Sequence, residues 1–550
     1  MARQQPLYLI FQWHMHQPFY RDPLSGEYLL PWTRLHVTKD YTDMAWHLER
    51  YPEMKCAVNF VPSLLLQIQA YADFEGMEER PLRVTTMPAA DLTVEEQRFA
   101  LQWFFRTHEE QILRQSPRYT ELHRKRGPEP TPENISAAQQ SFTVQDYLDL
   151  QVWFLLAWTG QDLRRRPEVR ALLEKDAGFR EFEKARLLEI HREAIRSVLS
   201  RYDALRQGGQ IEITGTPYAH PILPLLIDSD IARLSLAGVS LPVHRFRHPQ
   251  EAERQVVRGV RVFRETMDWR LEGMWPAEGA VSEAALDLLA QQGIRWIATD
   301  SNILARSLAT NAEPVRLTPQ QQYAPYTFTT GHGDLTLFFR DQRLSDAISF
   351  RYAHMDAGEA VDDFMTQLHT IDQELPDDGF PYLVVITMDG ENAWEYFPEN
   401  GRPFFDELYG RLTETPDIAP TTFGEYLNRP AAPNVLERVH PGSWIQADFH
   451  IWIGDALKNA AWDRLNEALR FLAQQRAAGV PIPEEAEQAA LQAEGSDWFW
   501  WYGQPNHSPH EHLFDRLFNN ALRAIYRTME APVPASLGKD ILEAAEQAGS

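Results

Sequence analysis

The sequence predicts an α/β protein, an incomplete (β/α)7 barrel with a helical insertion and a helical C-terminal region. Short apolar runs rich in β-branched and aromatic residues recur along the chain, and segments with helical periodicity separate them, which is the pattern of a parallel sheet or barrel. Most of these runs end in polar or aromatic residues, as barrel strands do on the face that carries a site. The runs number about seven, one short of the eight strands of the commonest barrel.

The barrel strands are predicted from their short runs of apolar, β-branched or aromatic residues. In chain order they are Leu7–Trp13, Cys56–Phe60, Ile211–Thr214, Gly273–Trp275, Trp296–Thr299, Thr336–Phe339 and Tyr382–Thr387. Because the chemistry of such barrels gathers at the carboxyl ends of the strands, we expect the functional residues directly after these segments.

A long insertion, at about residues 72–207, separates the second predicted strand from the third. Its helical periodicity predicts helices over Val94–Gln115 and Val144–Leu156, and a proline-rich break at residues 127–132 lies between them. With this insertion, residues 1–430 form the predicted barrel domain.

The character of the chain changes after the stretch Pro430-Ala431-Ala432-Pro433. Asp455–Arg476 and Leu513–Met529 have helical periodicity. We therefore predict that residues 431–550 form a helical C-terminal region that packs on the barrel and contributes to its cleft.

Charge and cysteine content narrow the possible partners and location. The 53 basic and 78 acidic residues give a net charge of -25, which repels phosphate backbones and makes nucleic acid an unexpected partner. Cys56 is the only cysteine, so no intramolecular disulfide forms, and a reducing, cytoplasmic location is expected. The apolar run Leu7–Phe11 is too short for a signal-peptide core, and no stretch is long enough to predict a membrane span.

The first candidate motif, His14-Met15-His16-Gln17-Pro18, follows the first predicted strand. Residues i and i+2 of a strand face the same side, so His14 and His16 point together. Such a pair suits two metal ligands or two hydrogen-bonding partners of a sugar, and a purely structural pair is the alternative.

The second and third motifs each place an acid near a strand. Glu212 lies inside an apolar strand that leads to His220, and a Glu there is costly unless it is paired or functional. Glu278 follows Trp275 just past another strand, where a glycosidic nucleophile would fit. A buried ion pair is the alternative for Glu212, and a favourable charge at a helix start is the alternative for Glu278.

The fourth and fifth motifs combine acids with aromatic residues. A strongly apolar strand runs into Asp389-Gly-Glu391-Asn-Ala-Trp394, which suggests metal binding or acid/base chemistry, or else a polar turn. Asp497 and Trp498 begin an aromatic cluster that resembles a sugar-stacking wall, with a buried aromatic cluster as the alternative. No phosphate loop and no Gly-x-Ser-x-Gly elbow occurs in the sequence.

Taken together and in this order, the five motifs resemble the five short sequence regions of glycoside hydrolase family 57, and they span residues 14 to 503. That family contains α-amylases, amylopullulanases, 4-α-glucanotransferases and branching enzymes. The resemblance implies an incomplete seven-fold barrel followed by a helical region, no obligatory cofactor and an α-glucan as the substrate.

The resemblance also implies roles for the matching residues. Glu278 falls on the catalytic nucleophile and Asp389 on the general acid/base, and three of the tryptophans are expected to stack on sugar rings. The residues expected to bind substrate are His14, His16, Gln17, Glu212, His220, Trp275, Glu391, Trp394, Asp497 and Trp498.

With these two acids, the implied activity is retaining hydrolysis of starch, glycogen, pullulan or maltooligosaccharides by double displacement. The fourth and fifth motifs are more similar to amylopullulanase-type members, and Gln17 replaces the leucine that is usual in branching-type members. Pro276 and Gly279 match no single activity.

Three alternatives stay open. Within the family, the chain would be a 4-α-glucanotransferase or a branching enzyme. Outside it, His14, His16 and Asp389 would bind zinc, as in a metal-dependent carbohydrate hydrolase or deacetylase. The third alternative is a glucan-binding protein without activity.

Overall fold

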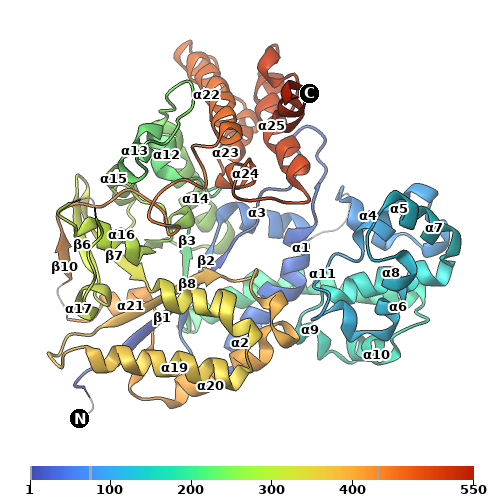
Figure 1. The fold of residues 1–550 in the computed structure, drawn as a ribbon, viewed down its shortest axis with the longest axis horizontal. Coiled ribbons are helices and arrows are strands. Elements are labelled where there is room, and N and C mark those ends of the chain that lie inside the picture. Colours follow the sequence, from blue (N-terminus) through green and yellow to red (C-terminus); the bar gives the residue numbers. More distant parts are fainter. Residues whose placement is uncertain (1–2, 73–76, 312, 431–432, 550) are drawn as a thin grey trace.

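The computed structural model describes residues 3–72, 77–311, 313–430 and 433–549, and within them seven parallel strands close into a barrel (Figure 1). The barrel strands are β1 (Leu7–Met15), β2 (Cys56–Phe60), β3 (Ile211–Gly215), β4 (Gly273–Met274), β5 (Trp296–Asp300), β7 (Gly333–Arg340) and β8 (Leu383–Asp389). Pairing of Arg340 with Val385 closes the ring between β7 and β8. The predicted (β/α)7 fold and all seven predicted strands are therefore confirmed.

Three further strands extend the barrel edge. They are β6 (Tyr326–Thr330), antiparallel to β7, β9 (Ile418–Pro420), which pairs with β1, and β10 (Asn434–Leu436), which pairs with β6.

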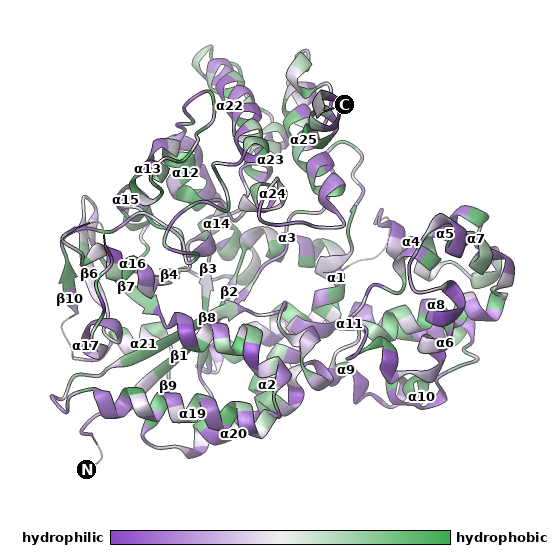
Figure 2. Ribbon diagram, in the orientation of Figure 1, coloured by the Kyte–Doolittle hydropathy of each residue, from purple (hydrophilic) through white to green (hydrophobic). Residues whose placement is uncertain are grey.

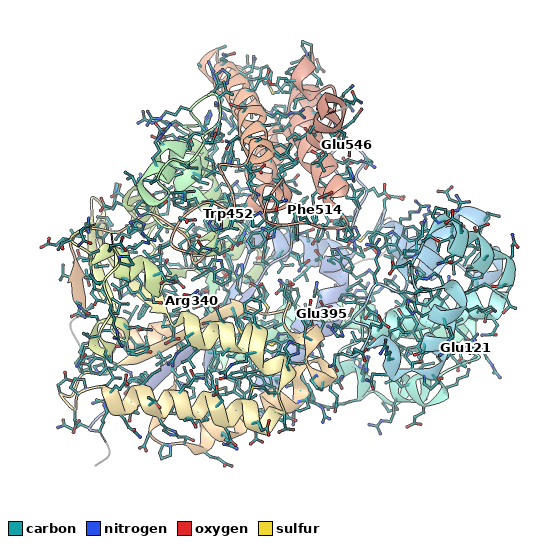
Figure 3. All side chains as sticks on the ribbon, in the orientation of Figure 1. Glu121, Arg340, Glu395, Trp452, Phe514 and Glu546 are labelled. Carbon is teal, nitrogen blue, oxygen red and sulfur yellow. The ribbon has the colours of Figure 1, made fainter. Side chains whose placement is uncertain are left out.

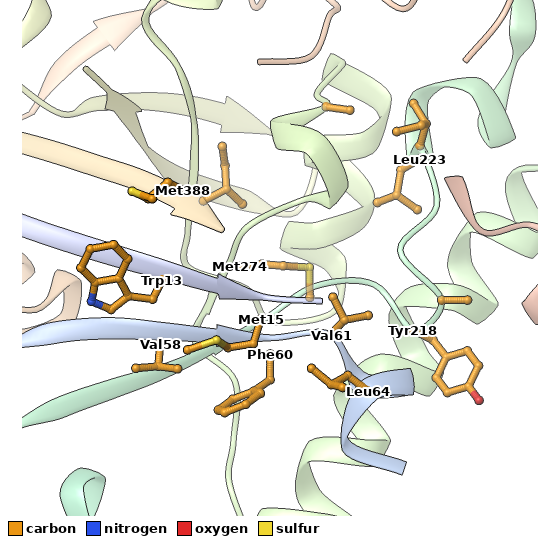
Figure 4. Close-up of a cluster of buried hydrophobic side chains, with 14 of the residues drawn as sticks. Trp13, Met15, Val58, Phe60, Val61, Leu64, Tyr218, Leu223, Met274 and Met388 are labelled. Carbon is orange, nitrogen blue, oxygen red and sulfur yellow. The ribbon is translucent and has the colours of Figure 1, made fainter. Parts of the chain in front are cut away.

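Helices surround the barrel and bury the outward-facing side chains of its strands. The longer ones are α2 (Thr42–Arg50), α3 (Pro62–Tyr71), α11 (Glu181–Gln207), α14 (Pro249–Met267), α15 (Glu283–Gln291), α19 (Ala357–Glu374) and α20 (Arg402–Glu414). Figure 4 shows Trp13, Met15, Val58 and Phe60 of β1 and β2 in this apolar layer, with Leu64 of α3. Figure 2 shows that the barrel strands are mostly apolar, while the helices around them alternate between polar and apolar residues.

The insertion is a separate helical body with its own hydrophobic core, to the right of the barrel in Figure 1. Its main helices are α4 (Arg80–Thr86), α5 (Val94–Trp103), α6 (Pro117–Arg126), α7 (Pro132–Ser141), α8 (Val144–Ala157) and α10 (Pro167–Lys175). The prediction for Val144–Leu156 is confirmed. The predicted helix Val94–Gln115 is wrong beyond Trp103, because α5 ends there and a turn follows.

The C-terminal helices lie above the barrel in Figure 1. They are α22 (Ala456–Ala477), α23 (Glu484–Ala493), α24 (Ser496–Trp501), α25 (Glu511–Thr528) and α26 (Ile541–Gly549). The helices predicted at Asp455–Arg476 and Leu513–Met529 correspond to α22 and α25.

Ala431 and Ala432 of the predicted boundary, and residues 73–76 of the predicted insertion, lie outside the described residues. Among the described helices, none has the length and apolar composition needed to cross a membrane.

One buried histidine in the helical layer predicts how stability depends on pH. The His47 ring stacks on Phe405 at 4.5 Å, and neither ring nitrogen has a hydrogen-bond partner among the described residues. Burial, with smaller contributions from the charges of Arg50 and Arg402, lowers the pKa of His47 to about 3. The unfolded chain takes up this proton near pH 6.5, so the native state loses stability as the pH falls below about 6.5, by up to about 1.4 kcal/mol per pH unit.

We expect the free energy of unfolding of His47→Leu to fall less between pH 7.5 and pH 5 than that of the wild type. The check is chemical unfolding at pH 7.5 and pH 5, with His369→Leu, at an exposed position, as the matched control. An equal loss of stability between the two pH values in both variants would show that His47 does not contribute.

Candidate active site

Strand register brings the first and fourth motifs together at the carboxyl end of the barrel. His14 on β1 pairs with Asp389 on β8 and with Asn59 on β2. Gly390, the next residue after Asp389, packs closely on Met15: a Cβ at this position would lie 2.2 Å from the Met15 sulfur. Adjacent parallel strands thus hold His14 beside the predicted acid/base.

His14 is oriented by a hydrogen-bond network inside the barrel. The Asn59 amide nitrogen donates to Thr214 Oγ1 at 2.9 Å and to the Gly215 carbonyl at 2.8 Å, so Asn59 Oδ1 is the acceptor that faces His14 Nδ1 at 2.7 Å. Burial lowers the pKa of His14 to about 4, which keeps the ring neutral. With its proton on Nδ1, His14 keeps a lone pair on Nε2, which can accept from a sugar hydroxyl.

His16 and His220 form a stacked pair that ties the barrel to α24. Their ring centroids are 3.9 Å apart. His16 Nε2 lies 2.7 Å from Asp497 Oδ1, and His220 Nδ1 lies 2.9 Å from Ser496 Oγ. Burial alone would lower the pKa of His16, but the charge and hydrogen bond of Asp497 outweigh it and raise that pKa. Burial, with the nearby charges of His16 and His14, holds the pKa of His220 well below its usual value. The C-terminal region therefore supplies part of the site.

Glu278 occupies a turn after β4 with a left-handed backbone, φ 58°. Its Oε2 accepts a hydrogen bond from Trp444 Nε1 at 2.8 Å, and its carbonyl accepts from the Trp444 backbone N–H at 2.9 Å. Its other carboxylate oxygen, Oε1, lies 3.9 Å from His220 Nδ1. Burial and then the Asp389 charge raise the pKa of Glu278 to about 8, against the opposing effects of His16 and the Trp444 hydrogen bond.

The charge of Asp389 acts on several other titratable groups of the site. It raises the pKa values of Glu278, His14 and Glu391, and its Oδ2 accepts from Asn392 Nδ2 at 2.9 Å. The structure thus brings Glu278, Asp389 and the three histidines into one electrostatically coupled group.

Glu391 and Gln17 are buried beside this group, and their contact with substrate stays a prediction. Glu391 is 2% exposed, and its Oε1 accepts from the His16 backbone N–H at 3.1 Å and from Gln17 Nε2 at 3.2 Å. Tyr20 donates to Gln17 Oε1 at 2.9 Å. Burial raises the pKa of Glu391 well above its usual value. Through these hydrogen bonds both residues hold the His-x-His segment in place.

The three tryptophans expected to stack on sugar are buried. Trp275 is 0% exposed, Trp394 is 1% exposed and Trp498 is 3% exposed. Trp394 and Trp498 donate their indole N–H groups to backbone carbonyls, of Gly390 at 2.8 Å and Gln492 at 2.7 Å. The ring of Trp275 packs edge-on against Trp444. This packing is that of the aromatic-core alternative, and the stacking of these three side chains on sugar stays a prediction.

Glu212 is not brought to the acids. It lies on the inner face of β3, two residues before Thr214, toward the amino ends of the strands. Its Oε2 accepts from Gly424 N at 2.8 Å in the short helix α21 (Phe423–Leu427), and burial raises its pKa to about 7. Glu212 thus binds a helix start at the barrel floor instead of lining the site.

Sequence reasoning missed Asn59 and Trp444. Asn59 is a polar residue inside an apolar strand, a signal of the same kind as the one that marked Glu212. Trp444 lies in an irregular segment before α22, with no motif around it, so only the folded chain brings it to Glu278.

One possible metal-binding group occurs among the described residues, made of His16, His220 and Asp497, with donor atoms within 4.8 Å of one another. Imidazole lone pairs lie in the ring plane, and these two rings are stacked at an interplanar angle of only 21°. Stacked rings cannot both point at one ion about 2.0–2.1 Å away unless one ring turns out of the stack.

We therefore expect full activity after exhaustive dialysis against a chelator, measured on maltooligosaccharides with metal analysis of the same sample. Stoichiometric zinc whose removal abolishes turnover would support the metal-hydrolase alternative.

Carbohydrate-active hydrolases use a parallel barrel with two carboxyl groups and a cluster of polar side chains at the carboxyl ends of its strands, which is the arrangement found in this protein. The sequence model of Glycosyl hydrolase family 57 matches residues 10–439, more than half of the chain. The chain belongs to glycosyl hydrolase family 57.

Solved structures resemble the whole fold. A GH57-type branching enzyme from the hyperthermophilic archaeon Pyrococcus horikoshii is 14% identical, with a TM-score of 0.60 over 98% of this chain and 94% of that one. The α-amylase AmyC from Thermotoga maritima is 13% identical, with a TM-score of 0.57 over 96% of this chain and 93% of that one. A 4-α-glucanotransferase from Thermococcus litoralis is 15% identical, with a TM-score of 0.54 over 95% of this chain and 60% of that one. No curated protein matches the sequence significantly.

Proposed function

We propose that this protein is a retaining glycoside hydrolase that acts on α-glucans such as starch, glycogen, pullulan or maltooligosaccharides. The observation that carries the proposal is that Glu278 and Asp389, two acids from distant parts of the sequence, lie beside three stacked histidines at one end of the barrel. Retaining glycosidases need two such carboxyl groups, one to attack and one to transfer the proton.

In the proposed reaction, the Glu278 carboxylate attacks the anomeric carbon while Asp389 protonates the departing oxygen. The bond from the anomeric carbon to that oxygen breaks, and a glycosyl ester forms on Glu278. Asp389 then takes a proton from water, which displaces Glu278 and restores the α configuration. His14 Nε2, His16 and His220 bind hydroxyl groups of the sugar and orient it for both steps.

The raised pKa of Glu278 describes the empty site, where burial and the Asp389 charge favour its protonated form. On that basis alone, Glu278 would carry a proton in the empty site. The Trp444 hydrogen bond to Oε2 already opposes this rise, and the positive charge that develops at the anomeric carbon during the reaction favours the carboxylate, which supports the proposed roles.

Transfer to a second glucan is the second candidate function, as in a branching enzyme or a 4-α-glucanotransferase. The observation in its favour is that the fold matches a branching enzyme over nearly the full length of both chains. The same covalent intermediate serves both functions, and the acceptor decides between them.

Product analysis separates the candidates. The enzyme is incubated with maltoheptaose, pullulan and amylose, and the products are measured by chromatography before and after a debranching enzyme. Hydrolysis gives new reducing ends in proportion to bonds cleaved, and cleavage of pullulan adds α-1,6 activity of the amylopullulanase type. Longer chains or branches without new reducing ends would assign a transferase instead, and an inactive protein that binds glucan would overturn the enzymatic proposal.

A cytoplasmic location is also part of this proposal. It is supported by Cys56, the chain's only cysteine, which is buried as a free thiol.

A further inference from the structure

Arg340 is a buried cation at the carboxyl end of β7 that none of the proposed chemical steps uses. It is 5% exposed, and Figure 3 shows it in the interior of the barrel region. Its Nε lies 2.7 Å from Asp300 Oδ2, its Nη1 donates to the Thr387 carbonyl at 3.0 Å, and its Nη2 lies 3.1 Å from Asp346 Oδ1. Because every guanidinium nitrogen is engaged, the plane of the group is fixed.

The fixed guanidinium group of Arg340 packs on Trp444, the residue that donates a hydrogen bond to Glu278. The Arg340 guanidinium carbon lies 4.7 Å from the centroid of the Trp444 ring, a cation–π contact. Trp275 packs edge-on against the same ring, with centroids 5.3 Å apart. The Trp444 indole is therefore confined by Arg340 and Trp275, and its N–H is aimed at Glu278 Oε2.

The same guanidinium also reaches the strand of the second acid. Thr387, whose carbonyl accepts from Arg340, lies two residues before Asp389 on β8. A single rigid group thus contacts the support of Glu278 and the backbone that carries Asp389.

We infer that Arg340 is a positioning residue that fixes the Glu278 carboxylate through Trp444 and fixes the end of β8 that carries Asp389. This inference rests on the proposed function, because it assumes that these two acids carry the reaction. Lysine cannot replace arginine here, since a lysine ammonium offers a point charge without the flat fork that meets the indole ring, Asp300 and the carbonyl together.

The competing explanation is that Arg340 only stabilises the fold through its ion pair with Asp300. A purely structural role lowers the unfolding temperature and the amount of active protein but leaves kcat per active site unchanged. A positioning role lowers kcat, because small displacements of reacting groups slow the chemical step by as much as about a hundredfold.

The test is a double-mutant cycle with Arg340→Lys and Trp444→Phe. Trp444→Phe leaves the Arg340 ion pairs in place and removes the indole N–H together with part of the ring, so it gives a result even where Arg340→Lys folds poorly. We expect each variant to lower kcat on an aryl α-maltoside about ten- to a hundredfold, with KM within about twofold. In the double variant the loss should be close to the larger single loss, because both changes break the same support.

The pH profile is the second readout. Loss of the donor to the Glu278 carboxylate raises the pKa of Glu278 further, so the acid limb of kcat/KM should move to higher pH in both single variants. Wild type and the variants share the other titratable groups that act on Glu278, so these do not account for the change. Those groups are Asp389, His16, His220 and Asp497.

Arg34→Lys is the matched control, because Arg34 is fully buried and its ion pair with Glu79 lies outside the site. We expect Arg34→Lys to lower stability and to keep the wild-type kcat and pH profile. Independent losses that multiply in the double variant, or an unchanged kcat in Arg340→Lys, would overturn the inference. If Glu278→Gln stays active, the proposed function itself has failed; if only Arg340→Lys stays active, the inference alone has failed.

Discussion

Replacing Glu278 with Gln is expected to lower turnover by several orders of magnitude on every substrate. The amide has nearly the same shape and can still accept the Trp444 hydrogen bond at Oε1, but it cannot attack the anomeric carbon. The loss should be equally large for glycosyl fluorides, since the first step needs the nucleophile whatever group departs. Steady-state kcat on maltoheptaose and on α-glucosyl fluoride measures it.

A nearby acid provides the control for this substitution. Glu272, just before β4, is exposed and pairs with Arg295, so Glu272→Gln changes the same charge without touching the site. We expect Glu272→Gln to keep the wild-type rate within about twofold, as is usual for surface substitutions. If Glu278→Gln retained a tenth of the wild-type kcat, Glu278 would not be the nucleophile.

Replacing Asp389 with Ala is expected to have an effect that depends on the leaving group. The variant lacks the proton donor, so cleavage of a natural glucan should fall by a factor of about 10² to 10⁴ or more, the usual contribution of general acid catalysis. Fluoride departs without protonation, so the first step with α-glucosyl fluoride should survive far better. Pre-steady-state measurement of fluoride release checks this, and an equal loss on both substrates would remove Asp389 from the proton-transfer role.

Much of the barrel was predictable because its signal is local. A parallel strand buried on both faces is a continuous apolar run such as Leu383–Ile386, and the polar residues Thr387 and Asp389 come shortly after it. The register of His14 with Asp389 and Asn59 also follows once the strand order is known. The limits of the helices were harder to predict, since the periodicity after Trp103 continues in the sequence although α5 ends there.

The parts of the site that the sequence did not predict depend on tertiary contacts. Trp275 and Trp498 are aromatic residues of the kind that stack on sugar, and their burial in core clusters is visible only in the folded chain. Glu212 has the sequence context of a site residue, but it lies two residues before Thr214 on β3, and its carboxylate accepts from Gly424 N. Trp444 reaches Glu278 across 166 residues of sequence, a pairing that no local pattern encodes.

Asp497, which the sequence analysis singled out for its motif, shows the same limit. The sequence places it in an aromatic cluster of the C-terminal region, without any sign of its partner. In the fold, α24 brings it to His16, 481 residues away, and this contact sets the ionisation of the histidine.

The anomeric configuration of azide products tests the assignment of the two acids most directly. Azide added to Glu278→Ala with α-glucosyl fluoride takes the place of the missing nucleophile, so the account predicts a β-glycosyl azide. Azide added to Asp389→Ala intercepts the glycosyl-enzyme without base assistance, so the account predicts the α-glycosyl azide. The coupling constant of the anomeric proton in the NMR spectrum distinguishes the two products. An α product from Glu278→Ala together with a β product from Asp389→Ala would contradict the account and exchange the roles of Glu278 and Asp389.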